Sequence, residues 1–122
     1  MPTILIVDDS SLSRKTSRRI LEGGGYQVRD VADGMSALEQ YSLERPDLVL
    51  LDVTMTDMNG LEVLDQLRAM DSSATVVMAT ADVQSSTRDL AMKGGAAGFV
   101  TKPFDRDAVL AAVASALEGV AP

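Results

Sequence analysis

The chain has 122 residues, a formal net charge of −7 and neither cysteine nor histidine. Its acidity excludes a bare nucleic-acid binder, because phosphate backbones select basic surfaces. Without cysteine or histidine it has no disulfide, no thiolate or imidazole metal site and no histidine acid–base chemistry, so any reaction must use carboxylates, hydroxyls, lysine or the backbone.

Length and hydropathy indicate the domain organisation. Apolar residues make up 46% of the chain, which is enough for one continuous core, so we expect residues 1–122 to form a single domain. The apolar run at the amino terminus is too short to span a membrane and has no signal-peptide features. We therefore expect a soluble cytoplasmic protein with no membrane or nucleic-acid partner.

The first predicted element is a buried strand. Ile4–Val7 is continuously apolar and stops at Asp8 and Asp9. An amphipathic helix follows over residues 12–21. We expect its inner face to consist of Leu12, Thr16 and Ile20, and its basic outer face of Arg14, Lys15, Arg18 and Arg19. Tyr26–Val31 then alternates apolar and charged residues, which is typical of an edge strand.

The remaining elements continue the alternation of helix and strand. Met35, Leu38 and Tyr41 indicate a helix that ends before Pro46, and the wholly apolar strand Leu48–Leu51 stops at Asp52. Further strands are predicted over Thr75–Ala79 and Gly98–Thr101. Further helices are predicted around Leu61, Leu64 and Leu67, and over Val83–Lys93. A last helix is predicted after the N-cap Asp105, and it should bury Leu110, Val113 and Leu117.

This alternation predicts an α/β fold. Right-handed crossovers between parallel strands place helices on both faces of the sheet. The two most apolar strands, Ile4–Val7 and Leu48–Leu51, should be central, with Tyr26–Val31 at an edge. We therefore predict a doubly wound, flavodoxin-like fold with five parallel strands in the order 2-1-3-4-5, whose switch point lies between strands one and three.

Polar side chains follow the strands at the points where they end. Asp8 and Asp9 follow the first strand, Asp52 the third, Thr80 the fourth and Lys102 the fifth, so a parallel sheet gathers them at one edge. Three carboxylates repel one another unless a hard divalent cation such as Mg²⁺ lies among them. An ammonium and a hydroxyl nearby can hold phosphoryl oxygens.

Each of these residues alone has a simpler interpretation. An acidic pair after a strand commonly caps a helix, and a single lysine is usually a surface charge. Their joint occurrence at four strand ends favours a functional site.

These positions resemble the receiver domains of response regulators in two-component signalling. The resemblance runs from about Ile4 to Leu117 and rests on these segments: Val7-Asp8-Asp9-Ser10, Leu51-Asp52, Met55, Met58-Asn59-Gly60, Thr80-Ala81 and Gly98-Phe99-Val100-Thr101-Lys102-Pro103-Phe104. Among receivers, the chain is similar to the stand-alone chemotaxis-type regulators.

The resemblance implies a role for each matching residue. Asp52 would accept a phosphoryl group from a phosphohistidine of a sensor kinase or phosphotransfer protein. Mg²⁺ would be held directly by Asp9, Asp52 and the Thr54 carbonyl, and by Asp8 mainly through water. Thr80 and Lys102 would each contact a phosphoryl oxygen, and together with Phe99, the aromatic switch residue, they would change partner binding. The small Ala81 would leave the acyl phosphate accessible, and Arg14 would help to dock the phosphodonor. The Lys102–Pro103 bond would be cis.

The resemblance also predicts where the signal leaves the domain. A downstream protein would bind the face made by the fourth helix, fifth strand and fifth helix. Thr56 departs from the family pattern, since proline is frequent there, and we expect it to loosen the loop after Asp52.

Three alternatives stay open. The chain could be a receiver excised from a longer regulator. It could be a flavin mononucleotide carrier of the same topology, although Asp8-Asp9 stands where a flavin phosphate loop would be hydroxyl- and glycine-rich. It could also be a phosphatase with an aspartyl-phosphate intermediate, although such enzymes usually carry an aspartate where this chain has Thr54.

Overall fold

The computed structural model describes residues 1–81 and 85–119, in which strands and helices alternate. The strands are β1 (Thr3–Val7), β2 (Gln27–Val31), β3 (Leu48–Asp52), β4 (Val76–Thr80) and β5 (Gly98–Thr101). The helices are α1 (Ser11–Gly23), α2 (Gly34–Leu43), α3 (Gly60–Met70), α4 (Ser85–Lys93) and α5 (Arg106–Leu117). The predicted start of the fourth helix at Val83 lies outside the described residues.

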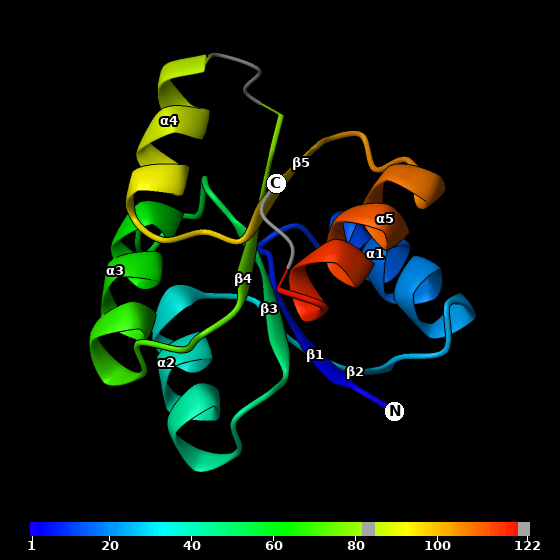
Figure 1. Cartoon of the computed structure of the whole chain (residues 1–122), viewed down its shortest axis with the longest axis horizontal. Coiled ribbons are helices and arrows are strands. Elements are labelled where there is room, and N and C mark those ends of the chain that lie inside the picture. The colour runs from blue at the N-terminus through cyan, green and yellow to red at the C-terminus, as the bar shows by residue number, and fades with distance from the viewer. Residues whose placement is uncertain (82–84, 120–122) are drawn as a thin grey trace.

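The sheet is parallel, with the order β2-β1-β3-β4-β5. Helices α2, α3 and α4 cover one face, and α1 and α5 cover the other (Figure 1). Both the predicted strand order and the doubly wound arrangement are therefore confirmed.

Two cores lie on opposite faces of the sheet, because successive strand residues point to opposite sides. Leu5 and Val7 pack in the core under α2, α3 and α4, whereas Ile4 and Ile6 pack in the core under α1 and α5. Both cores are built from the wholly apolar strands, which explains why β1 and β3 are central.

The predicted inner face of α1 is only partly right: Ile20 packs against the core, but Leu12 does not face it. Leu12 is 75% exposed, whereas Ser17 and Leu21 are fully buried. The Ser17 hydroxyl donates to the Ser13 carbonyl at 2.9 Å, so this buried polar side chain has its hydrogen-bond partner within its own helix. Ser17 can therefore occupy a buried position of α1, whereas hydropathy predicts Leu12 as the buried residue.

Two other helices bury only some of the residues predicted. Met35 is 64% exposed, whereas Tyr41 is buried as predicted, together with Gly34 and Ala37. In α5 the fully buried residues include Val109 and Val113, while the predicted Leu110 and Leu117 are only partly buried. Across the described ranges, every helix is too short or too polar to cross a bilayer.

Candidate phosphoryl-transfer site

The strand register brings the predicted site residues to one edge of the sheet. Val7 pairs with Leu51 and Asp52 with Ala79, so Asp8 emerges beside Asp52. Thr80 pairs with Thr101, which places Lys102 next to them at the end of β5. Asp8 and Asp52 are 2% and 5% exposed, so two carboxylates lie together in a largely dry environment.

Asp9 completes a cluster of three acids. Asp8, Asp9 and Asp52 each offer one carboxylate oxygen, and these oxygens all lie within 4.8 Å of one another. Hard oxygen donors that carry three negative charges fit Mg²⁺, which prefers such ligands together with water. The donor set is therefore chemically suited to a divalent cation.

Lys102 supplies the counter-charge for the two buried acids. Its Nζ lies 2.9 Å from Asp8 Oδ2 and 3.4 Å from Asp52 Oδ2, and its side chain is 16% exposed. Burial nevertheless raises the pKa of Asp52 to about 6; Lys102 opposes this rise, and the negative charge of Asp8 adds to it. The site is thus short of positive charge.

A depression of about 430 Å³ opens beside Asp52. It is lined by Asp52, Thr54, Thr80, Ala81 and Lys102. The Thr54 N–H donates to Asp52 Oδ1 at 3.4 Å, a long contact. One side of the Asp52 carboxylate is therefore reachable from solvent past the small side chain of Ala81.

Thr80 and Phe99 project from the same face of the sheet. Thr80 is paired with Thr101 and Met78 with Phe99, so Phe99 lies diagonally across from Thr80 on the neighbouring strand. Phe99 packs against the core under α4, and the guanidinium carbon of Arg88 lies 5.9 Å from its ring centroid. The predicted cis Lys102–Pro103 bond is confirmed.

Arg14 faces inward rather than lying on a free basic face. Its Nη1 donates to the Asp8 carbonyl at 2.9 Å, and its Nε lies 3.6 Å from Asp30 Oδ1. Arg18 also pairs with Asp30 and donates to the Val28 carbonyl at 3.0 Å. Two of the four predicted outer basic residues therefore clamp α1 to β2, and docking at Arg14 stays a prediction.

The segment from the end of β3 to the first residue of α3 has two structural features that the sequence did not reveal. A Cβ on Gly60 would lie 2.1 Å from the Asp52 backbone oxygen, so only glycine fits behind Asp52. Asp57 accepts hydrogen bonds from Gly34 and Met35 at the start of α2. No local pattern signals this contact, because it joins residues 23 positions apart.

That Thr56 loosens this loop stays a prediction. The Thr56 N–H donates to Asp9 Oδ2 at 3.1 Å and ties the loop to the acidic cluster.

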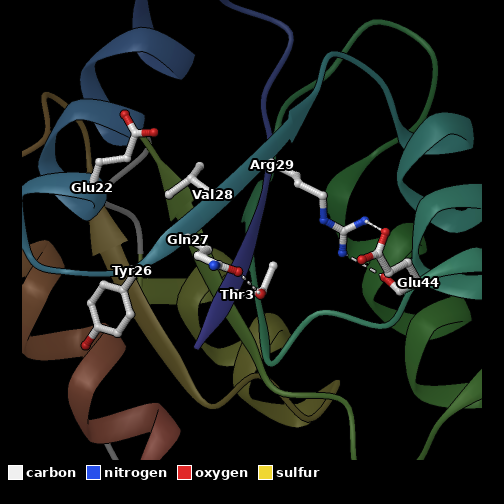
Figure 2. A pocket seen from close by; sticks show the side chains of 7 residues that line it. All are labelled: Thr3, Glu22, Tyr26, Gln27, Val28, Arg29 and Glu44. Atoms are coloured by element: carbon white, nitrogen blue, oxygen red, sulfur yellow. Dashed lines mark hydrogen bonds and ion pairs between the residues drawn. The ribbon is translucent and has the colours of Figure 1, made fainter. Parts of the chain in front are cut away.

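A larger hollow of about 520 Å³ lies along β2, away from these acids. Figure 2 shows its lining residues Thr3, Glu22, Tyr26, Gln27, Val28, Arg29 and Glu44. Its charged groups are already neutralised, since Arg29 lies 3.4 Å from Glu44 and Glu22 lies 3.4 Å from Arg18. The candidate site is therefore the acidic edge of the sheet, where charge is not balanced.

Comparison with known proteins identifies the class. Residues 4–114 match the model of the response regulator receiver domain. Chemotaxis protein CheY of Listeria monocytogenes is 39% identical over 117 residues, which cover 95% of this chain and 98% of that protein. Response regulator MprA of Mycobacterium leprae is 37% identical over 119 residues, which cover 98% of this chain and 52% of that protein.

A solved structure gives the same result. A LuxR-family two-component response regulator from Aurantimonas superimposes with a TM-score of 0.94 and 31% identity, covering 99% of this chain and 88% of that one. The chain belongs to the response regulator receiver family, whose members are signalling switches. The resemblance stated from the motifs is thereby confirmed.

Proposed function

We propose that this chain is a phosphoacceptor switch in which Asp52 takes a phosphoryl group from a phosphohistidine of a sensor kinase or phosphotransfer protein. The observation that carries the proposal is the setting of Asp52: its carboxylate is largely buried but lines a depression open to solvent. Two further acids flank it, and Lys102 Nζ lies 3.4 Å away. No histidine of its own could act as the donor, since the chain has none.

The acidic cluster would hold Mg²⁺. Asp9 and Asp52 are the proposed direct ligands together with the Thr54 carbonyl, while Asp8 would act mainly through water. When bound, the ion supplies positive charge that offsets the charge on the phosphoryl oxygens. The proposed ion site lies among the carboxylate oxygens of Asp8, Asp9 and Asp52, which are within 4.8 Å of one another.

The chain's own residues account for the transfer. An oxygen of Asp52 attacks phosphorus in line, the O–P bond forms, and the P–N bond to the donor imidazole breaks. Lys102 moves from the carboxylates to a phosphoryl oxygen, and the Thr80 hydroxyl donates to another. Ala81 leaves the acyl phosphate open, so water can later attack phosphorus and return Asp52 to its carboxylate form.

The new dianion would shift a two-state equilibrium through Thr80 and Phe99. Two charge-assisted hydrogen bonds together contribute about 3 to 6 kcal/mol. A switch from 1:99 to 99:1 needs about 5.5 kcal/mol, so these contacts are large enough for most of the change. Movement of Thr80 would let Phe99 turn inward, which alters the α4-β5-α5 face where a downstream protein would bind.

The experiment that tests this function is treatment with a small phosphodonor. Acetyl phosphate with Mg²⁺ should add one phosphoryl mass to the intact protein, and excess EDTA or the Asp52→Asn substitution should abolish the addition. Equal labelling of Asp52→Asn would contradict the assignment.

The similarity to CheY supports a chemotaxis-type regulator that acts in the cytoplasm as a single domain. The match to about half of MprA supports the alternative of a receiver within a longer regulator. Attachment to an output domain would leave the chemistry at Asp52 unchanged.

A further inference from the structure

The amino end of α2 is capped by carboxylates from two parts of the chain. Asp33, the N-cap, accepts from the Ser36 N–H at 2.7 Å. Asp57 accepts from the Gly34 N–H at 3.1 Å and from the Met35 N–H at 3.2 Å. The N–H groups of the first three helical residues, which the helix itself leaves unpaired, are therefore satisfied, two of them by a residue of the β3–α3 loop.

The residue before Asp57 contacts the acidic site. The Thr56 N–H donates to Asp9 Oδ2 at 3.1 Å. Adjacent residues thus fasten the loop at two points, with Asp57 on α2 and Thr56 on a carboxylate of the acidic cluster. Asp9 therefore contributes one carboxylate oxygen to the cluster and accepts one hydrogen bond from the loop.

The following loop residues are also fixed in place. A Cβ on Gly34 would lie 3.0 Å from Met58 Sδ, so Met58 packs directly over the start of α2. Asn59 caps α3 by accepting from the Leu61 N–H at 2.8 Å. The direction of the Thr56 N–H therefore depends on where Asp57 and Met58 dock.

We propose that Asp57 is a positioning residue for the acidic site: by docking the loop on the start of α2, it holds the Thr56 N–H against Asp9 and so orients that carboxylate toward Asp8 and Asp52. The hydrogen bond from Gly34 is the main cause of the lowered pKa of Asp57, because it favours the charged carboxylate. The predicted effect of Asp57 on Mg²⁺ affinity rests on the proposed function, whereas its effect on the position of the Thr56 N–H does not.

The mechanical link can be tested without metal. Amide hydrogen exchange at Thr56, followed by NMR in EDTA, should accelerate about fivefold or more in Asp57→Ala, as expected when a typical hydrogen bond is lost. Asp57→Asn keeps one acceptor oxygen and should fall between wild type and Asp57→Ala. Asp65→Ala, which removes an exposed carboxylate from α3, is the charge control and should match wild type.

The link to Asp9 is tested by two substitutions at one position. Thr56→Pro removes the backbone N–H, whereas Thr56→Ala keeps it. Calorimetric titration with MgCl₂ should show about tenfold weaker binding by Thr56→Pro and Asp57→Ala, at the low end of the roughly 10- to 100-fold effect of outer-shell partners. Thr56→Ala and Asp65→Ala should bind as wild type does.

The outcomes separate this inference from the proposed function. Unchanged Thr56 exchange in Asp57→Ala would overturn the positioning role even if wild type binds Mg²⁺. Equal Mg²⁺ affinity of Thr56→Pro and Thr56→Ala would overturn the role of the N–H. Absence of Asp52-dependent Mg²⁺ binding by wild type would instead defeat the metal proposal, and the exchange experiment would still decide the role of Asp57.

Discussion

Gly60 lies directly behind Asp52: a Cβ at Gly60 would be 2.1 Å from the Asp52 backbone oxygen and 2.7 Å from the Val53 Cα. The Gly60 N–H also donates to the Val53 carbonyl at 2.7 Å. Both neighbours are backbone atoms, so no side-chain rotation can relieve an added methyl group. The first turn of α3 therefore sets the position of Asp52.

We predict that Gly60→Ala destabilises the protein by about 1–3 kcal/mol, the usual cost of forced overpacking, and slows labelling of Asp52. Chemical denaturation and acetyl phosphate labelling measure the two effects. Gly23→Ala is the matched control, because its Cβ would lie 4.0 Å from the nearest atom, in Arg106. Equal stability of the two variants would refute the steric argument.

Removal of Lys102 should expose the repulsion between the two buried acids. Lys102→Met leaves Asp8 and Asp52 without their cation, and loss of one partner of a buried ion pair costs about 3–5 kcal/mol. Saturating Mg²⁺ should restore much of this stability, since ligands that bind only the folded state stabilise it. Thermal unfolding with MgCl₂ and with EDTA tests this, and Lys15→Met on the exposed face of α1 should show neither effect.

Asp52 should make metal-free stability depend on pH. Its pKa is about 6 in the fold and 3.8 in the unfolded chain, so the folded state binds more protons between these values. The unfolding free energy should therefore fall as pH rises from about 4 to 6, by at most about 3 kcal/mol. Asp52→Asn should lack this decrease and exceed wild-type stability at pH 7 in EDTA; parallel profiles for the two proteins would argue against a protonated, buried Asp52.

Thr80→Ala should separate phosphorylation from output. The hydroxyl is proposed to hold a phosphoryl oxygen after transfer, so the variant should still label at Asp52 but lose partner binding. NMR shifts of the Phe99 amide on phosphorylation should shrink strongly in Thr80→Ala. Thr101→Ala, the exposed register partner, should respond as wild type does. Wild-type Phe99 shifts and partner affinity in Thr80→Ala would break the proposed coupling.

The sequence could predict the sheet because its signals are local. Apolar runs such as Leu48–Leu51 can only be buried on both faces, and a polar residue after each run identifies the carboxyl edge. Once the strands are ordered, Asp8, Asp52 and Lys102 must meet, and the structure brings them together as expected.

Contacts between distant segments could not be predicted in the same way. Nothing near Asp57 indicates that it caps α2, since its partners are 22 and 23 positions earlier. Arg14 looks like a solvated charge until β2 places Asp30 beside it. Hydropathy likewise missed Ser17, because a serine that bonds to its own helix can be buried at little cost.

The central claim is that Asp52 alone carries the phosphoryl group. Acyl phosphates are reduced by borohydride, which converts a phosphorylated aspartate to homoserine that peptide mass spectrometry can locate. After treatment with acetyl phosphate and Mg²⁺, we predict homoserine at position 52 and none without Mg²⁺. Homoserine at Asp8, Asp9 or Asp57, or no conversion at all, would contradict the account.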